Sequence, residues 1–394
     1  MFFEESPDRQ SLSEFSCDVA ILGAGFAGLM CARKLTRLGY RVAVIEPLTE
    51  VLGGASSRNE GWLHAGTYHA LSIGDRDQAR QVAERCRYGW EQIRRDFPEA
   101  LEPEGHAAIA IVSEDRVAES ARRWDSAGVG YRPASARDLK VVVGDVAIGP
   151  NERPFLVDDL GLDVRVLAAR LGHEIRAAGG VILTGHRPTA LGESSVQLTG
   201  GPTRTLHFRT LLLATGYATS KVCGELGLEP PAIRLWRSHL IALPRLTGPS
   251  VFSVAGGHAA MINHGPWSIA GLNEDAEIVP EPTFEPNPEV ARRLVEAVVA
   301  RFPRADISAA HVTACVKVDV IEAPNAARSL NIRVGELAQD VLYVLPGKMT
   351  EAPFTADVVA REIVGRLGMP GVCDRPIDQR SMSVSAGERR EVFV

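Results

Sequence analysis

The 394-residue chain contains few cysteines and lysines, and it lacks any long apolar run. Its six cysteines form no Cys-x-x-Cys pair, which argues against a zinc ribbon or a redox dithiol, and we expect no metal site. A chain of this length can bury a large core without disulfides. No apolar stretch reaches the length of a membrane span, so we expect no integral membrane segment. Lysine occurs only as Lys34, Lys140, Lys221, Lys317 and Lys348.

The charge balance excludes some classes of partner. With 43 Lys+Arg against 49 Asp+Glu, the formal net charge is -6, so the chain has no global tendency to bind nucleic acid or an anionic membrane. The first sixteen residues carry acids and no apolar core, unlike a signal peptide, and we therefore expect a cytoplasmic location. Hydrophobic residues at 45% and charged residues at 23% exclude disorder for most of the chain.

A strand–turn–helix–strand pattern occupies residues 18–46. The apolar run 19–22 is typical of a parallel strand buried on both faces. Leucine and alanine then recur at helical spacing as far as Gly39, where a helix would end, and a second strand pattern ends on Glu46. Between the first strand and the helix stands a glycine-rich turn composed of Gly23, Ala24, Gly25, Phe26, Ala27 and Gly28.

This turn has the spacing of a dinucleotide-binding motif. Gly23 permits the tight turn, Gly25 lets the backbone approach a pyrophosphate, and Gly28 allows close packing of helix and strand. The helix N-terminus offers N–H groups and a partial positive charge to that pyrophosphate. Glu46, 21 residues after Gly25, is placed to accept hydrogen bonds from ribose hydroxyls. The motif alone leaves NAD and FAD both open.

A second stretch follows at 53–68 and is rich in small and polar residues. Small residues at 53–57 allow a close approach to a large planar ligand, while Ser56, Ser57 and Asn59 supply hydrogen-bond donors. Arg58 could neutralise a phosphate or clamp a substrate carboxylate. His64 by itself is equally typical of an ordinary core histidine.

The segment SSRNEGWLHAG resembles the flavin-contacting stretch of FAD-dependent oxidoreductases of the D-amino-acid-oxidase-like superfamily. The nearest branches are L-2-hydroxyglutarate oxidases or dehydrogenases and flavin glycerol-3-phosphate dehydrogenases. The resemblance implies that Ser57, Arg58 and Asn59 contact FAD and that His64 lies near the flavin ring. The match to the motif that tethers flavin covalently is poor, so we expect non-covalent FAD.

Two later segments resemble the same family. The strand ending Ala214-Thr215-Gly216 resembles its Ala-Thr-Gly strand end near the cofactor. The run Gly347-Lys348-Met349-Thr350, after an apolar strand at 341–345 and before a helix, resembles the Gly-Gly-Lys-x-Thr segment of glycerol-3-phosphate dehydrogenases, with Pro346 in place of the first glycine. A lysine at a helix N-terminus would stabilise the negative charge of a reduced flavin.

The remaining elements predict the organisation of the chain. Strand patterns dominate 232–272 and recur at 312–321 and 329–334, which indicates a largely antiparallel sheet. We therefore predict an α/β (mixed α+β) fold in which a Rossmann-type FAD-binding domain is interleaved with a substrate domain built on a mixed or antiparallel sheet. The predicted FAD-binding segments are 17–75, 150–230 and 335–368, the substrate segments are 76–149 and 231–334, and 369–394 is a C-terminal tail.

Candidate residues for the chemistry come from both predicted domains. Histidine is the side chain suited to accept an alcohol proton near neutral pH, so His64, His264 and His239 are candidates for the base. Arg328 could clamp a carboxylate or phosphate, and Lys348 would support the reduced flavin. Arg237, Asn263 and Lys317 are further polar candidates on the predicted sheet.

These features predict an FAD-dependent oxidoreductase that oxidises a small polar substrate, a 2-hydroxy acid or polyol-type secondary alcohol, by hydride transfer to flavin N5. The electrons would then pass to oxygen or to a carrier. Oxidation of an amine or amino acid on the same scaffold is the alternative, and fold analogy cannot decide between the two. A third alternative is a nucleotide-binding module without redox chemistry.

Overall fold

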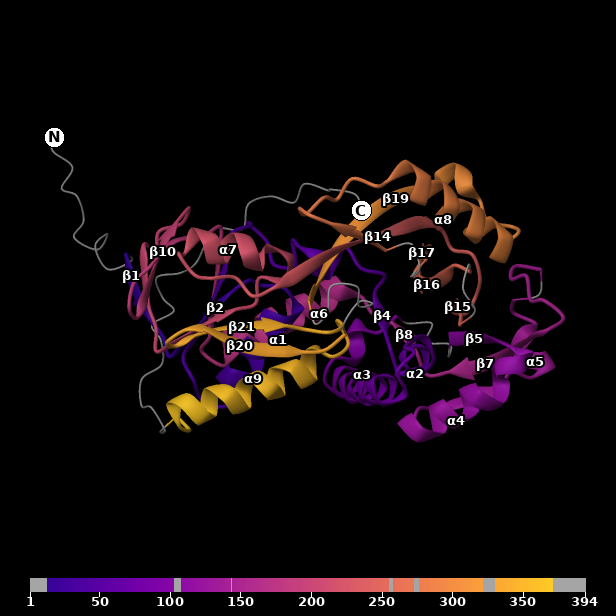
Figure 1. The fold of residues 1–394 in the computed structure, drawn as a ribbon, viewed down its shortest axis with the longest axis horizontal. Helices are drawn as coiled ribbons and strands as arrows, with labels where there is room; N and C mark the ends of the chain where they lie inside the picture. The colour runs from indigo at the N-terminus through magenta and orange to yellow at the C-terminus, as the bar shows by residue number, and fades with distance from the viewer. Residues whose placement is uncertain are drawn as a thin grey trace.

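The computed structural model describes residues 13–102, 108–142, 144–254, 258–272, 276–321 and 330–370. The molecule is elongated, with a six-stranded sheet towards one end and a nine-stranded sheet towards the other (Figure 1). The predicted mixed α/β fold class is confirmed. In the described part of the chain, no helix combines the length and the apolar character that a membrane crossing requires.

The six-stranded sheet contains the glycine-rich turn. Its order is β20-β21-β13-β2-β3-β9; β20 is antiparallel to its neighbour, and the other strands are mutually parallel. The strands are β2 (Val19–Leu22), β3 (Val42–Glu46), β9 (Val181–Thr184), β13 (Thr210–Leu213), β20 (Arg333–Ala338) and β21 (Val341–Leu345). β2 and β3 are buried along their whole length, as their continuous apolar sequences predict.

Different layers cover the two faces of this sheet. Alternate residues of β2, such as Val19 and Ile21, pack against the helices α1 (Phe26–Arg37), α6 (Val164–Ala177) and α9 (Ala352–Leu367). The intervening residues Ala20 and Leu22 pack on the opposite side against a four-stranded sheet. That sheet is β1 (Glu14–Ser16), β12 (Thr205–His207), β11 (Ser195–Thr199) and β10 (Arg187–Leu191), with α7 (Thr219–Glu225) beside it.

The nine-stranded sheet is almost entirely antiparallel. Its path is β18-β14-β17-β16-β15-β5-β7-β6, with β19 paired along β14, and only β15 and β5 are parallel. The strands are β5 (Ala108–Ser113), β6 (Tyr131–Pro133), β7 (Glu152–Val157), β14 (Ile233–Pro244), β15 (Val251–Ser253), β16 (Ala260–His264), β17 (Trp267–Gly271), β18 (Glu277–Val279) and β19 (His311–Val320).

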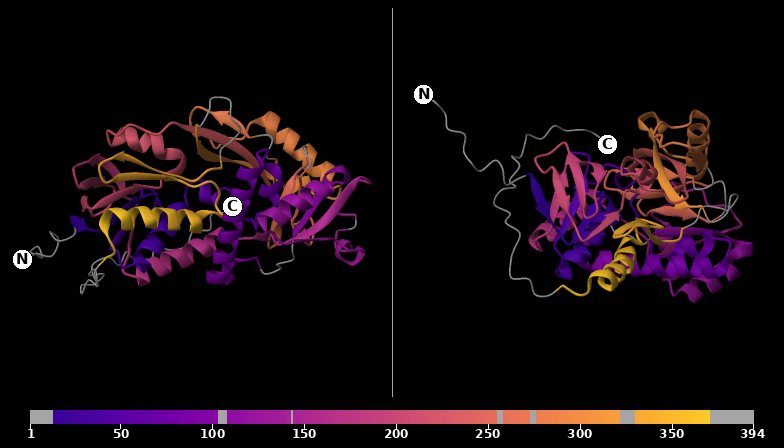
Figure 2. Two further views of the ribbon diagram at one scale, coloured as in Figure 1. Left: turned by 60° about the horizontal axis from the view of Figure 1, so that its bottom comes forward. Right: turned by 60° about the vertical axis from the view of Figure 1, so that its left-hand side comes forward.

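Helices cover both faces of this sheet as well. α2 (Thr67–Ser72), α3 (Arg76–Asp96) and α4 (Val117–Ala127) lie on one side, where Trp124 is fully buried. α5 (Ala136–Leu139) and α8 (Pro288–Arg301) lie on the other side, and Figure 2 shows the orange α8 far from the yellow α9. A short pair, β4 (Trp62–Leu63) and β8 (Leu160–Gly161), lies where the two parts of the molecule meet.

The structure differs from the sequence-based expectation in two places, at the strand expected at 329–334 and within the segment 150–230. The strand expected at 329–334 for the antiparallel sheet is wrong: β20 begins at Arg333 and lies at the edge of the six-stranded sheet. The reason is a tight hairpin to β21, in which Asp340 adopts a φ of 59°. β7 lies within the segment 150–230 predicted for the FAD-binding domain, but it pairs with β5 in the nine-stranded sheet. The division of the chain into the FAD-binding and substrate segments given above remains a prediction.

Candidate active site

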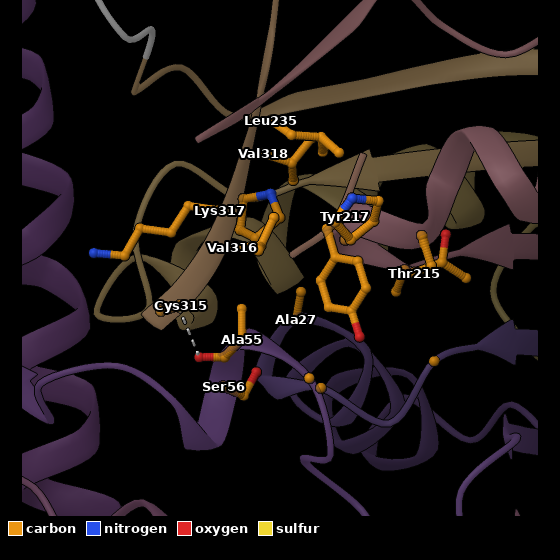
Figure 3. Close-up of a pocket in the computed structure, with 18 of the residues that line it drawn as sticks. Ala27, Ala55, Ser56, Thr215, Tyr217, Leu235, Cys315, Val316, Lys317 and Val318 are labelled. Carbon is orange, nitrogen blue, oxygen red and sulfur yellow. Dashed lines mark hydrogen bonds between the residues drawn. The ribbon is translucent and has the colours of Figure 1, made fainter. Parts of the chain in front are cut away.

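A cavity of about 1260 Å³ lies between the six-stranded sheet and the strands β14, β18 and β19. Its wall includes the carboxyl ends of several parallel strands, at Leu22, Glu46 and Ala214, where open α/β sheets bind their ligands. Facing them are side chains of β14 and β19 such as Leu235, Cys315 and Val316 (Figure 3). The cavity is thus formed by segments from nearly the whole length of the chain.

The glycine-rich turn closes one side of the cavity. Gly23 has a φ of 103°, and a Cβ there would lie 2.6 Å from the carbonyl oxygen of Ala214. A Cβ on Gly28 would lie 2.0 Å from the carbonyl oxygen of Gly23, so only glycine permits this helix–turn packing. Gly25 precedes α1 without any side-chain cap of its own. Gly25, Phe26 and Ala27, at the start of α1, line the cavity.

Glu46 is at the end of β3 and is 8% exposed. Its carboxylate accepts hydrogen bonds from the backbone N–H of Ala24 at 2.9 Å and of Leu48 at 3.1 Å. Burial raises the pKa of Glu46 above its ordinary value, while these two hydrogen bonds act in the opposite direction. A carboxylate offers about four acceptor positions, so further ones remain for ribose hydroxyls.

The polar residues that follow Gly54 divide into two groups. Ser56 lines the cavity, and its Oγ accepts a hydrogen bond from the N–H of Phe26 at 3.1 Å. Asn59 also lines the cavity and bonds the carbonyl oxygen of Ser56 at 2.7 Å. Ser57 and Arg58 are exposed, and Arg58 stacks on the Phe284 ring at 4.7 Å. The structure thus brings Ser56 and Asn59 to the cavity and leaves Ser57 and Arg58 outside its lining.

The segment after β13 lies beside the glycine-rich turn, because β13 and β2 are neighbouring parallel strands. Ala214, Thr215 and Gly216 all line the cavity, and the Thr215 hydroxyl is 3.0 Å from that of Thr219. The next residue, Tyr217, also lines the cavity (Figure 3), and its ring lies 3.3 Å from the position that a Cβ on Gly54 would take. Its ring also meets the Phe284 ring edge-on at 5.4 Å. The Ala-Thr-Gly segment therefore lies where the sequence predicts cofactor contacts.

The loop between β21 and α9 reaches the cavity from another direction. Gly347, Lys348, Met349 and Thr350 all line it. A Cβ on Gly347 would lie 2.1 Å from the carbonyl oxygen of Leu330, which explains the glycine. The Thr350 hydroxyl accepts a hydrogen bond from the N–H of His64 at 3.1 Å. This bond joins the loop to the His64 segment.

A buried ion pair between Glu351 and Arg85 joins this loop to α3. Glu351 is fully buried, and its carboxylate accepts a hydrogen bond from Arg85 of α3 at 2.6 Å. Arg85 also donates to the carbonyl oxygen of Leu330. Burial raises the pKa of Glu351, against the opposing charges of Arg85 and Lys348. The loop that carries Lys348 is therefore held by α3 as well as by its own helix.

His64 lines the cavity and is held in one orientation by its neighbours. Its Nδ1 lies 3.1 Å from Oδ1 of Asp159, a fully buried carboxylate that also accepts a hydrogen bond from the Thr67 hydroxyl. The ring stacks on Trp62 at 5.6 Å with an angle of 10° and meets His69 edge-on at 4.5 Å. An ionised carboxylate at Nδ1 requires the proton on Nδ1 and leaves the Nε2 lone pair as an acceptor.

The other two histidine candidates lie outside the cavity lining. Both ring nitrogens of His264 are engaged, Nδ1 with Glu102 at 2.9 Å and Nε2 with the carbonyl oxygen of Glu60 at 2.8 Å. His239 is 2% exposed, and its Nε2 accepts a hydrogen bond from the N–H of Asn287 at the start of α8. The structure therefore does not bring either ring to the cavity, and a role for them as a base stays an untested prediction. Arg328 lies outside the described residues.

Glu60 and Lys317 form an ion pair within the cavity lining. Oε1 of Glu60 is 3.5 Å from Nζ of Lys317, which projects from β19. Burial of Glu60 favours protonation, but Lys317, Lys348 and His64 together lower its pKa to about 2. Figure 3 shows the Lys317 side chain extending away from Tyr217. One end of the cavity thus holds His64, Lys348, Glu60 and Lys317, while Glu46 and Tyr217 lie towards the other.

Sequence reasoning missed Asp159, Glu60, Tyr217 and Cys315 as residues of this site. Tyr217 directly follows the Ala-Thr-Gly segment, so that motif carried a usable signal for it. Glu60 lies inside the quoted stretch, but nothing local shows that Lys317 would face it. Asp159 is 95 residues from His64, and Cys315 is 260 residues from its partner, the Ala55 carbonyl oxygen. Only the fold reveals these contacts.

The arrangement fits FAD. The N-terminus of α1, where Gly25 supplies no side chain and only the Phe26 N–H is bonded to Ser56, suits a pyrophosphate. Glu46 suits the adenosine ribose, and a Cβ on Gly23 or Gly28 would clash with the backbone. The opposite end supplies a lysine at the N-terminus of α9 and a histidine with an acceptor nitrogen. Within the described ranges, no group of three or more His, Cys, Asp or Glu side chains could hold a metal ion.

Comparison with known proteins agrees with this assignment. The sequence profile of the DAO family, described as FAD dependent oxidoreductase, matches residues 18–360. A protein of Pseudomonas aeruginosa, named as a probable FAD-dependent oxidoreductase, is 24% identical over 376 residues, which cover 88% of this chain and 91% of the relative.

Solved structures share the fold. Glycine oxidase from Geobacillus kaustophilus superposes with a TM-score of 0.68 at 18% identity, covering 88% of this chain and 94% of that one. L-alpha-glycerophosphate oxidase from Mycoplasma pneumoniae, solved with FAD bound, has a TM-score of 0.68 at 15% identity, covering 89% and 95%. The profile match spans most of the chain and includes every segment that forms the cavity. The chain belongs to the DAO family of FAD-dependent oxidoreductases.

Proposed function

We propose that this FAD-dependent oxidoreductase oxidises a small polar secondary alcohol of the 2-hydroxy acid or polyol type, as the branches named for 2-hydroxyglutarate and glycerol 3-phosphate do. The observation that carries the proposal is the His64–Asp159 pair at the cavity. Membership in a redox family excludes the alternative of a nucleotide-binding module without redox chemistry.

The pair suits the removal of a hydroxyl proton. Asp159 holds the Nδ1–H of His64, so Nε2 can accept the proton of the substrate O–H. Asp159 also stabilises the imidazolium that results. FAD, when bound, supplies the acceptor for the hydride that leaves the same substrate carbon. The substrate thereby loses one proton and one hydride, two electrons in all, and becomes a carbonyl compound.

The cations at this end of the cavity suit an anionic substrate group. Lys317 and Lys348 line the wall near His64 and can attract a carboxylate or a phosphate. Lys348 also lies at the N-terminus of α9, where helix dipole and ammonium act together on negative charge of the cofactor. Arg58 is exposed and lies outside the cavity lining, so we prefer the two lysines as the groups that bind a substrate carboxylate or phosphate.

Oxidation of an amine or amino acid is the second candidate. Its support is the name of glycine oxidase among the structural neighbours, whose likeness at 18% identity concerns the fold. An amine substrate would lose an N–H proton in place of the hydroxyl proton. The His64–Asp159 pair is less necessary in that case, since a neutral amine already donates electrons readily.

An anaerobic substrate panel tests the proposal. Purified holoenzyme is mixed with 2-hydroxy acids, polyol phosphates, amines and amino acids, and bleaching of the flavin absorbance is followed. We expect bleaching by hydroxy acids or polyol derivatives. Bleaching by amines or amino acids alone would establish the second candidate in its place. Repeating the experiment with air or an artificial carrier then identifies the electron acceptor as oxygen or a carrier.

We propose further that FAD is bound without a covalent bond. His64, the histidine that lines the cavity among the described residues, uses Nδ1 for Asp159, and the proposed chemistry requires its Nε2 as a proton acceptor. Precipitation with acid should release all yellow colour into the supernatant. Colour that stays with the precipitated protein would contradict the proposal.

A further inference from the structure

Thr350 is a buried threonine between two groups that the proposed chemistry uses. It follows Lys348 by two residues in the loop between β21 and α9, and it is 1% exposed. Its hydroxyl accepts a hydrogen bond from the N–H of His64 at 3.1 Å and donates one to the carbonyl oxygen of Trp62 at 3.3 Å. One side chain therefore connects the loop of Lys348 to the segment of the proposed proton acceptor.

These two backbone groups belong to one edge of the short strand β4. At its other edge β4 pairs with β8, and the N–H of Leu162 donates to the carbonyl oxygen of Gly61 at 2.9 Å. Because successive residues of a strand direct their hydrogen-bonding groups to alternate edges, the C=O of Trp62 and the N–H of His64 point away from β8. The Thr350 hydroxyl serves this edge as a third strand would, since it supplies one acceptor and one donor.

The ring of His64 is held by the same pair of strands. Asp159, whose carboxylate lies 3.1 Å from Nδ1 of the ring, directly precedes β8. The pairing of Leu63 with Leu160 therefore determines where carboxylate and ring meet. Thr350 fixes the main chain of His64, and Asp159 fixes its ring. A displacement of β4 relative to Thr350 would carry the ring with it.

The loop that carries Thr350 packs directly on α3. A Cβ on Gly89 of α3 would lie 1.7 Å from the carbonyl oxygen of Thr350, so helix and loop leave no space for a methyl group. Arg85, one turn earlier on α3, holds the carboxylate of Glu351 at 2.6 Å. The loop is thus held on its α3 side, and the Thr350 hydroxyl transmits its position to β4.

We propose that Thr350 is a positioning residue for the transfer of hydride from the substrate. Its hydroxyl fixes the separation between His64 and the loop of Lys348, so that a substrate bonded to His64 presents its C–H bond to FAD once FAD is bound. This inference rests on the proposed function. Such a transfer depends steeply on the alignment of the reacting atoms, and a misplacement of about 1 Å can cost on the order of 10²-fold in rate.

Three variants isolate the hydroxyl of Thr350. Thr350→Val replaces it with a methyl group and removes both hydrogen bonds, whereas Thr350→Ser keeps a hydroxyl in place. Thr355→Val is the matched control, because Thr355 is also buried and its hydroxyl donates to the carbonyl oxygen of Glu351 at the start of the same helix. Comparison of the two valine variants separates the connection to β4 from the general effect of losing a buried hydroxyl.

Hydrogen–deuterium exchange tests the connection without catalysis. Mass spectrometry of the peptide that contains His64 measures the protection of its N–H. We expect this N–H to exchange roughly tenfold faster in Thr350→Val than in the wild type, since the donor has lost its acceptor. Thr350→Ser and Thr355→Val should exchange as the wild type does. Unchanged protection in Thr350→Val would overturn the inference.

Anaerobic reduction of the flavin-loaded proteins tests the consequence for the reaction. DL-lactate and glycerol 3-phosphate are the probes, and the concentration dependence gives a limiting rate and a half-saturating concentration for each. We expect Thr350→Val to lower the limiting rate roughly 10–10²-fold and to leave the half-saturating concentration within about threefold. Thr350→Ser and Thr355→Val should keep the wild-type limiting rate within about threefold.

The outcomes separate this inference from the proposed function. A limiting rate in Thr350→Val equal to that in Thr355→Val, or a change confined to the half-saturating concentration, overturns the positioning role while the oxidation of alcohols stands. Reduction by amines or amino acids alone overturns the proposed function and the inference with it. If Thr350→Val retains no flavin, Thr350→Cys decides, because a thiol is a weak hydrogen-bonding group. A wild-type limiting rate in Thr350→Cys overturns the inference, and a lowered one supports it.

Discussion

The six-stranded and nine-stranded sheets are stabilised in different ways. The central strands of the first, β2 and β3, are buried along their full length and almost wholly apolar. Buried ion pairs occur in both regions, as Glu351 with Arg85 at the start of α9 shows, but in the second region they also engage the strands of the sheet itself. Arg234 on β14 pairs with Asp319 on β19, with side chains 7% and 2% exposed, and Arg301 of α8 pairs with Glu152 on β7, at 2% and 16%.

The difference shows what each region tolerates. Apolar parallel strands tolerate exchange of similar residues, but a Cβ added at Gly23 or Gly28 in the glycine-rich turn would clash with backbone oxygens. A buried ion pair fails when either partner is removed, because an uncompensated charge remains inside. We therefore expect the cofactor region to respond to steric changes and the substrate region to respond to charge and pH.

The largest effect is expected at His64, in the segment that joins the two regions. His64→Gln removes the proton acceptor and should lower the rate of flavin reduction by alcohol substrates roughly 10²–10⁴-fold while FAD stays bound. Asp159→Asn should act in the same direction, since the ring would lose its orienting carboxylate. Anaerobic stopped-flow absorbance measures the rate.

His173→Gln, on an exposed position of α6, is the matched control and should leave the reduction rate unchanged. If the flavin of His64→Gln is reduced as fast as the flavin of this control, His64 has no role in proton transfer.

The second prediction concerns the buried ion pair of the substrate region. Glu152 accepts two hydrogen bonds from Arg301, at 2.9 and 2.8 Å, and one from the N–H of Gly149. Glu152→Gln should lower the free energy of unfolding by about 3 kcal/mol, since Arg301 would stay buried without its counter-charge. Chemical denaturation measures the change. Asp18→Asn, at the more exposed Asp18–Arg41 pair of the cofactor region, should cost less.

The same pair predicts an acid dependence. The hydrogen bonds from Arg301 lower the pKa of Glu152 to about 2, against the opposing effect of burial. The stabilisation is fully present above the ordinary value of 4.5 and is lost as the pH falls from there towards 2. Between pH 5 and pH 3.5, the wild-type free energy of unfolding should fall more steeply than that of Glu152→Gln. Equal slopes would show that the pair does not set the acid dependence.

The third prediction tests the steric limit of the cofactor region. In Gly28→Ala, the added Cβ would lie 2.0 Å from a backbone oxygen, so the turn must shift. We expect a loss of roughly 1–3 kcal/mol in stability and weakened retention of FAD. Visible absorbance after dialysis measures the retention. Gly248→Ala, whose Cβ would meet its nearest neighbour at 3.8 Å, should retain FAD as the wild type does, and an equal loss in both would contradict the steric explanation.

The smallest effect is expected at Lys348. Lys348→Met removes one positive charge near the proposed position of the reduced flavin and should lower its potential on the order of 30 mV, about 1.4 kcal/mol for a two-electron couple. Spectroelectrochemical titration measures the potential. Lys140→Met, at an exposed position, is the control. If both variants and the wild type have the same flavin potential, Lys348 does not stabilise the negative charge of the reduced flavin.

The segments around the cofactor were predictable because their signals are local. Gly23, Gly25, Phe26 and Ala27 of the turn, the acid Glu46 and the run from Gly347 to Thr350 line the cavity, and their contacts with FAD stay a prediction. Each segment follows an apolar run that predicts a buried strand, so its place at the carboxyl end of that strand can be predicted from the sequence.

The residues that handle the substrate were predictable only in part. His64 reaches the cavity, but His264 and His239 do not, since a histidine has the same sequence signature as a base and as a structural hydrogen-bond partner. Ser57 and Arg58 belong to a matching motif and still lie outside the lining, because the turn at 55–57 directs them outwards.

The sequence by itself determined the central parallel strands, the nucleotide-binding turn and the family, because local spacing and apolar runs encode them. Tertiary structure alone decided which distant groups meet. Asp159 orients His64 across 95 residues, and Lys317 reaches Glu60 across 257. The physical reason is that these contacts join segments far apart in the sequence, and a local pattern encodes the type of an element without encoding which distant segment packs against it. Two lysines illustrate the difference. Lys348 was identified from a sequence motif, whereas the pairing of Lys317 with Glu60 is visible only in the fold.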